Sequence, residues 1–107
     1  MLNQIVVVGR LVSDPQINET ENGNKVSYIT LAVSRCYKND AGIYETDFIP
    51  VKLFKNIAEN TADYCKKGDI VGVKGRIQTR QEEGKSTIEI VAEKVTFLSS
   101  RKEKEEE

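Results

Sequence analysis

The chain has 107 residues, enough for one domain, and 16 basic side chains stand against 17 acidic ones. A net charge of −1 excludes nucleic-acid binding through overall positive charge, so any such site requires clustered cations. Histidine, the commonest metal ligand and general base, is absent, and we expect no catalytic activity, no metal and no cofactor.

The two cysteines and the apolar segments indicate a cellular compartment. Cys36 and Cys65 do not form a CxxC motif, and we expect free thiols in a reducing environment. The apolar run near the N-terminus is short and lacks the basic segment of a secretory signal. No segment reaches the ~20 apolar residues of a membrane span. The sequence therefore predicts a soluble, cytoplasmic protein without membrane insertion.

The first predicted strand covers residues 4–12. Gly9 within it indicates a bulge or a sharp bend. Apolar side chains occur at both parities, so we expect burial on both faces, or burial on one face and a partner subunit on the other. The expected subunit-interface residues are consecutive: Ile5, Val6, Val7 and Val8.

The second and third predicted strands cover residues 25–35 and 46–54, and the polar stretch 36–45 is expected to link them as a hairpin. Strand side chains alternate between two faces. In the third strand this alternation assigns one apolar set to the core: Ile49, Val51 and Leu53. The opposite face then combines two aromatic rings with a cation: Phe48, Lys52 and Phe54.

One short helix is predicted after the third strand. Asn56 is expected to cap it, with Glu59 three residues later completing a capping box. Gly68 is expected to end the helix. Tyr64 falls on the apolar face of this helix, which predicts a place in the core.

The fourth and fifth predicted strands cover residues 69–80 and 86–98, joined by a short turn around Gly84. Five strands with one helix between the third and fourth is the order of an OB-fold, a five-stranded Greek-key barrel. We therefore predict an all-β domain of this type over residues 1–98. Residues 99–107 contain no apolar side chain, and we expect a charged flexible tail there.

A basic stripe on the fourth strand supports a nucleic-acid site, although a solvated strand face would look similar. Three cations, Lys74, Arg76 and Arg80, lie on the same face of this strand, and no acidic residue lies between them in the sequence. Aromatic rings stack on bases of any identity, and cations follow the phosphates. We expect stacking by Tyr37, Phe48 and Phe54. We expect phosphate contacts by seven cations: Arg35, Lys38, Lys52, Lys55, Lys74, Arg76 and Arg80.

Three other readings of these residues remain open at this point. An RNA-binding or primosome-type OB protein would use a similar face. An interaction module would use Phe48 and Phe54 only for protein contacts. A metal-dependent nuclease would need several carboxylates to converge, but the aspartates of this chain lie at turn and cap positions, where their conformational preferences explain them.

Five segments in order resemble the bacterial and phage single-stranded DNA-binding protein family. They read LNQIVVVGRLVSDPQ, YITLAVSR, ETDFIPVKLF, AENTADYCKKGDIVGVKGRIQTR and VAEKVTFL, and the resemblance covers residues 2–98. It implies an OB-fold and a homotetramer that wraps single-stranded DNA in replication, recombination, repair or DNA uptake. In that family the first strand takes part in subunit pairing.

The resemblance also assigns three of the family's base-stacking aromatics to Tyr37, Phe48 and Phe54. The fourth is replaced here by Gln81 and Glu82, and the turn that follows is shorter, which predicts a weaker or smaller site. Family members that recruit replication proteins end in an acidic tip finished by hydrophobic residues. This chain ends in glutamates, so we expect a short form without tail-mediated recruitment.

Overall fold

The computed structural model describes residues 2–98, so Met1 and residues 99–107, the predicted charged tail, lie outside the described part of the chain. No helix among residues 2–98 is long and apolar enough to cross a membrane. Within this part the elements follow in the order β1 (Ile5–Leu11), β2 (Asn18–Glu19), β3 (Lys25–Lys38), β4 (Tyr44–Phe54), α1 (Lys55–Tyr64), β5 (Ile70–Glu82) and β6 (Lys85–Phe97).

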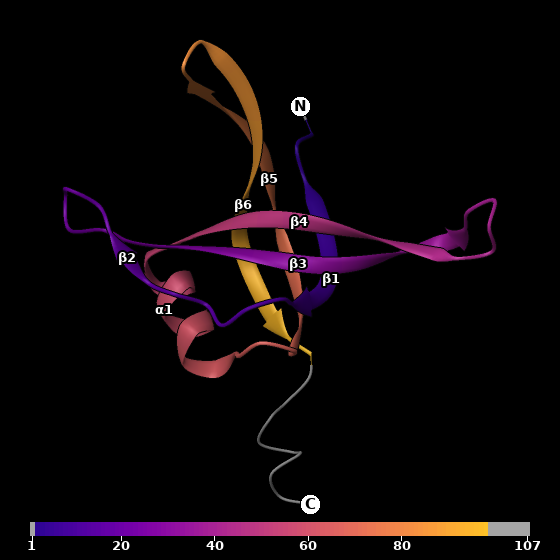
Figure 1. Cartoon of the computed structure of the whole chain (residues 1–107). Coiled ribbons are helices and arrows are strands. Elements are labelled where there is room, and N and C mark those ends of the chain that lie inside the picture. The colour runs from indigo at the N-terminus through magenta and orange to yellow at the C-terminus, as the bar shows by residue number, and fades with distance from the viewer. Residues whose placement is uncertain (1, 99–107) are drawn as a thin grey trace, which may run out of the picture.

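The five long strands close into a barrel. Neighbouring strands are hydrogen-bonded in the order β1-β5-β6-β4-β3, and β1 also pairs with β3, which completes the circle. The two-residue strand β2 only extends the sheet beside β3 (Figure 1). The helix lies between β4 and β5, which are the third and fourth long strands. The structure thus confirms the predicted OB-fold.

The barrel interior is filled by aliphatic side chains at alternating positions. On β4, Val51 and Leu53 are almost fully buried and Ile49 packs against the core cluster, as the alternation predicted. Burying one side chain of this kind contributes about 1.5–3 kcal/mol, so the cluster is the main stabilising element of the fold. The other strands add further residues with almost no exposed surface: Leu11, Ile29, Leu31, Val71 and Val73.

Two hairpins extend beyond the barrel as arms (Figure 1). In the turn of the β3–β4 arm, the Asn39 side chain accepts hydrogen bonds from the backbone N–H groups of Ala41 and Ile43 at 2.9 and 3.0 Å. The β5–β6 arm turns at Glu83 and Gly84, which both have positive φ, as tight two-residue hairpins require. Both turns are shorter than predicted, so the paired strands reach farther from the barrel.

Two glycines allow close approaches between neighbouring strands. β6 has one extra residue opposite the step from Lys74 to Gly75, and a Cβ at Gly75 would lie 2.1 Å from the Val91 carbonyl oxygen. At Gly9, β1 keeps a continuous register with β5, so there is no bulge of the predicted kind. A Cβ there would lie 2.9 Å from the Ala32 carbonyl oxygen, so this glycine lets β1 approach β3 and close the barrel.

The start of α1 differs from the predicted capping box. Because β4 continues to Phe54, this extended residue occupies the N-cap position without a side-chain cap bond, and Asn56 falls inside the helix. Glu59 forms a 2.7 Å ion pair with Lys25 of β3 instead of reaching back to the helix start. The predicted cap at Asn56 is therefore wrong, and a tertiary contact takes the place of the capping box.

The end of α1 also differs from the prediction. The helix ends at Tyr64, and Gly68 adopts its positive φ in the following loop instead of ending the helix. Tyr64, expected in the core, is 68% exposed, and its ring centre lies 5.7 Å from that of Phe97. Cys65 is buried instead, and burial raises the pKa of its thiol to about 11, so it packs as a small apolar group.

Candidate nucleic-acid interface

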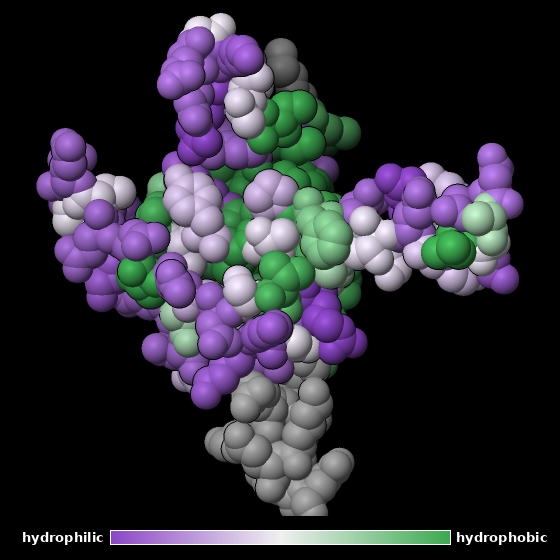
Figure 2. Space-filling model, in the orientation of Figure 1, coloured by the Kyte–Doolittle hydropathy of each residue, from purple (hydrophilic) through white to green (hydrophobic). Residues whose placement is uncertain are grey.

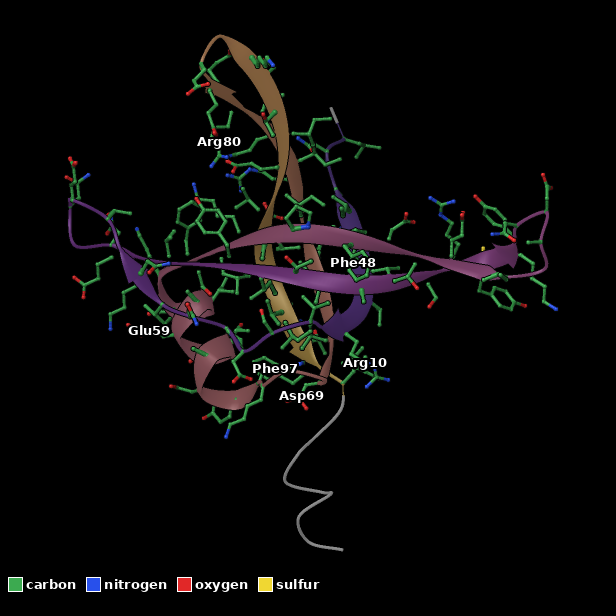
Figure 3. The ribbon with its side chains drawn as sticks, in the orientation of Figure 1. Arg10, Phe48, Glu59, Asp69, Arg80 and Phe97 are labelled. Carbon is green, nitrogen blue, oxygen red and sulfur yellow. The ribbon has the colours of Figure 1, made fainter. Side chains whose placement is uncertain are left out.

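The outer face of β3 and β4 carries the aromatic residues that alternation assigned to it. The β3–β4 pairing sets Lys52 directly opposite Tyr28, and Phe48 and Phe54 project from the same face of β4 as Lys52. Phe48 is 65% exposed and lies on the part of the β3–β4 ribbon that covers the barrel (Figure 3). This face therefore presents aromatic rings to solvent, as base stacking requires.

Lys52 lies between two of these rings. Its Nζ is 4.8 Å from the centre of the Phe54 ring and 5.6 Å from the centre of the Tyr28 ring, within cation–π range. The Lys52 side chain is only 18% exposed, so its ammonium group is held in place. Tyr28 is not among the stacking residues predicted from the sequence, because only the β3–β4 register shows that it lies opposite Lys52.

The basic stripe of β5 is accompanied by carboxylates. Arg76 pairs with Glu93 of β6 at 3.4 Å. Arg80 pairs with Glu82 at 2.8 Å and with Glu89 of β6 at 3.8 Å. The stripe is uninterrupted in sequence, but β6 runs antiparallel beside it and supplies two of these glutamates. The Arg76–Glu93 and Arg80–Glu82 pairs are exposed, and surface ion pairs contribute about 0–1 kcal/mol, so a phosphate group can replace either of these carboxylates at small cost.

Glu89 connects the two parts of the outer face. One carboxylate oxygen accepts a 2.7 Å hydrogen bond from Gln78 Nε2 and lies 4.0 Å from Lys52 Nζ. The other oxygen lies 3.8 Å from the Arg80 guanidinium. Because the Glu89 side chain is only 13% exposed, it holds both cations in position while it reduces the net positive charge of the face.

Arg35, on the β3–β4 arm, is engaged with two carboxylates. Its guanidinium donates two hydrogen bonds to Asp47, at 2.9 and 3.1 Å, and one to Glu45. The hydrogen bond with Asp47 raises the pKa of Arg35 and lowers that of the Asp47 carboxyl. Asp47 has the parity of the core residue Ile49, so this cluster lies on the face of β4 opposite to Phe48. The structure therefore does not bring Arg35 to the stacking face.

The other predicted contacts lie along the arm and at the edges of the barrel face. Tyr37 is 62% exposed, and the Nζ of Lys38 is 5.6 Å from the centre of the Tyr44 ring on the same arm. Lys55 is the first residue of α1, and Lys74 is exposed on β5. Within the part of the chain that the structure describes, Lys55 and Lys74 form no ion pair.

β1 divides the predicted interface residues between two faces. Ile5 and Val7 are partly buried, and Val7 packs against the core. Val6 and Val8 are 70% and 51% exposed. β1 pairs with β5 along most of its length but with β3 only at its last two residues. It therefore has an exposed apolar face and, for much of its length, one edge without a strand beside it.

A closed OB barrel that combines exposed rings with positioned cations belongs to a class of folds used for single-strand nucleic-acid binding. Residues 2–98 contain no group of three or more acidic, cysteine or histidine side chains that could hold a metal ion. The family comparison agrees with this class. The chain belongs to the single-strand binding protein family, whose model matches residues 2–98.

Individual relatives match nearly the whole chain. It is 43% identical over 106 residues to single-stranded DNA-binding protein B of Bacillus subtilis strain 168, covering 94% of both chains. It is 46% identical over 106 residues to single-stranded DNA-binding protein 2 of Staphylococcus aureus strain Mu50, covering 94% of this chain and 75% of the relative. It is 44% identical over 106 residues to the single-stranded DNA-binding protein of Bacillus cereus, of which it spans 62%. These names describe binding proteins and not enzymes.

Proposed function

We propose that this protein binds single-stranded DNA without sequence preference and protects it during replication, recombination, repair or DNA uptake. The observation that carries the proposal is Lys52, held between the Tyr28 and Phe54 rings on the outer face of an OB barrel. Rings can stack on any base for about 1–3 kcal/mol each, and a cation between them lies where the backbone phosphates pass. Membership of the single-strand binding protein family supports the same function.

Within this proposal the predicted binding residues make different contributions to DNA binding. Phe48 and Phe54 stack bases on the barrel face, and Tyr37 adds a ring on the β3–β4 arm. Arg35 contributes mainly by fixing the shape of that arm, because two carboxylates engage its guanidinium. The phosphate contacts come from six other cations: Lys38, Lys52, Lys55, Lys74, Arg76 and Arg80.

We also propose a homotetramer located in the cytoplasm. The exposed side chains of Val6 and Val8 and the partly open edge of β1 support subunit pairing through this strand, because a second copy would cover both features. Light scattering should report the tetramer. Val6→Asp combined with Val8→Asp should reduce the assembly state, while Lys25→Ala, on a different surface, should not. A wild-type monomer would contradict this proposal.

Competition binding tests the main proposal. A fluorescently labelled dT oligomer is bound, and an unlabelled dT oligomer, its RNA counterpart and a DNA duplex compete across a salt series, with anisotropy as the readout. We expect the dT oligomer to compete best. We also expect the logarithm of affinity to fall linearly with the logarithm of salt concentration, by about 0.7 for each phosphate contacted. Equal competition by duplex would contradict the proposal, and stronger competition by RNA would favour an RNA-binding protein.

A further inference from the structure

A small pocket lies at the base of the β5–β6 arm. β4 and β6 pair only at Val51–Lys52 with Ile90–Val91, and before this point β6 belongs to the arm (Figure 1). Between the diverging strands is a space of about 120 Å³, lined mainly by apolar surface that includes Tyr28, Pro50 and Ile88. Figure 2 shows hydrophobic surface where this arm meets the barrel.

The dimensions of the pocket favour a single planar ring as its occupant. Its volume of about 120 Å³ is smaller than that of pockets for whole drug-sized ligands, about 300–1,000 Å³. Two of its lining residues are accessible, since Tyr28 is 50% exposed and Ile88, on the arm, is 67% exposed. An accessible tyrosine ring and an accessible aliphatic side chain in one lining are suited to contacting a flat base.

The charges around the pocket also favour a base that is part of a bound nucleic-acid strand, because such a base carries a phosphate beside it. The lining includes two cations, Lys52 and Arg80, and one carboxylate, Glu89, which lies 4.0 and 3.8 Å from them, so the lining keeps a net positive charge. Lys52 Nζ lies 5.6 Å from the centre of the Tyr28 ring. A phosphate next to these cations would place its attached base near Tyr28. Lys52 also faces the Phe54 ring at 4.8 Å, so the pocket continues the stacking face.

The tip of the same arm is less suited to a base. Gln81 and Glu82 stand where an aromatic residue was expected from the family resemblance. Gln81 Nε2 is bonded to Ser86 Oγ at 2.7 Å, and Glu82 is paired with Arg80 at 2.8 Å. The Glu82 carboxylate is 60% exposed and repels a phosphate backbone, whereas the Glu89 carboxylate at the base of the arm is only 13% exposed, accepts a hydrogen bond from Gln78 and lies between two cations. A DNA strand that crosses this side of the barrel is therefore directed to the part of the arm next to the barrel and not to the tip of the arm.

We infer that this pocket is a base-binding subsite for single-stranded DNA, in which Tyr28 is the stacking ring and Ile88 adds an apolar contact. The inference rests on the proposed function and names a residue outside the set expected from sequence. It places one base at the base of the β5–β6 arm, where it compensates for the missing aromatic at the tip.

Substitution of Tyr28 tests the subsite. We expect Tyr28→Ala to weaken binding of a labelled dT oligomer by about 5- to 140-fold, the equivalent of one stacked base, and Tyr28→Phe to stay within about twofold of wild type. Tyr64→Ala is a matched control, because Tyr64 is also an exposed tyrosine but packs against Phe97 on α1's side of the barrel. Ile88→Ser, which removes an apolar lining residue of the pocket, should also weaken binding.

An abasic scan distinguishes stacking in the pocket from a general loss of structure. Bases are removed from the dT oligomer one at a time. The wild-type protein should bind more weakly to the oligomer that lacks the base occupying the pocket. The penalty at that position should disappear in Tyr28→Ala, because the two changes remove the same contact. Free thymidine monophosphate should not displace the oligomer. Displacement by the free nucleotide would overturn the inference in favour of a nucleotide site.

The outcomes for the inference and for the proposed function are separable. If wild type binds dT and Tyr28→Ala binds equally well, or keeps every abasic penalty, the subsite is wrong and the proposed function stands. If wild type does not bind dT in preference to duplex, the proposed function fails and the subsite fails with it.

Discussion

The outer face has two regions that look alike in sequence and differ in structure. On β3–β4, a cation lies between aromatic rings, as Lys52 does between Tyr28 and Phe54. On the β5–β6 side, Arg76 and Arg80 are paired with glutamates. In each region one strand places basic side chains on the outer face, Lys52 on β4 and the three cations of the stripe on β5, but the neighbouring strands decide how much positive charge remains. A basic stripe in a strand is therefore evidence for free positive charge only once the adjacent strand is known.

The difference predicts that rings on β3–β4 contribute more to binding than cations on β5–β6. We expect Phe54→Ala to weaken dT binding by about 1–3 kcal/mol, through loss of one stacking ring. Arg80→Ala should weaken it less, because its charge is already compensated by Glu82 and Glu89. Oligomer anisotropy measures both.

Phe54 also occupies the N-cap position of α1, so its substitution needs a folding control. Phe54→Leu retains an apolar side chain without the ring and should lose nearly as much affinity as Phe54→Ala. Thermal unfolding should show that Phe54→Leu keeps the fold. Equal effects of Phe54→Leu and Arg80→Ala on binding would remove the distinction between the two regions.

The salt dependence of binding compares cations in the two regions directly. Lys52→Gln should reduce the salt slope by about 0.7, the value of one phosphate contact on a single strand. Arg76→Gln should reduce the slope less, because Glu93 lies closer to Arg76, at 3.4 Å, than Glu89 does to Lys52, at 4.0 Å, and compensates more of its charge. Slopes are obtained from anisotropy titrations at four or more salt concentrations. A larger change for Arg76→Gln would reverse the order proposed for the two regions.

Removing a carboxylate should make the two regions more alike. Glu89 lies 4.0 Å from Lys52 and 3.8 Å from Arg80, so Glu89→Gln keeps the shape of the side chain and removes its charge. We expect tighter dT binding, by up to about 1 kcal/mol, together with a steeper salt slope. Glu59→Gln, which removes a glutamate paired with Lys25 near α1, is the control and should leave affinity nearly unchanged. Weaker binding by Glu89→Gln would show that its positioning of the cations outweighs its charge.

The smallest expected effect concerns the β3–β4 arm and depends on pH. Arg35 lowers the pKa of Asp47, so the folded pKa lies below the unfolded value of about 3.9. The ion pair therefore adds stability above the unfolded pKa and loses it as pH falls through the folded pKa. Urea unfolding should show Asp47→Asn slightly less stable than wild type near neutral pH, with the gap closing below about pH 4. A gap that widens on acidification would exclude this role for Asp47.

Local errors in the sequence prediction have a common cause. The expected capping box failed because β4 extends to Phe54 and Glu59 pairs with Lys25 of β3. The expected core position of Tyr64 failed because the helix ends there and Cys65 is buried instead. In each case a contact with a distant segment outweighed a local preference, and such contacts depend on how the barrel closes.

The sequence by itself determined the strand order, the OB-fold and the two faces of β4. Side-chain alternation has a period of two, so Val51 and Leu53 turn inward and Phe48, Lys52 and Phe54 turn outward in any structure that keeps this strand. Only the tertiary structure decided which residues meet across strands. The β3–β4 register sets Tyr28 opposite Lys52, and the position of β6 brings Glu89 to the cations. Hydrogen bonding between segments far apart in the chain fixes these pairings, and no local pattern encodes them.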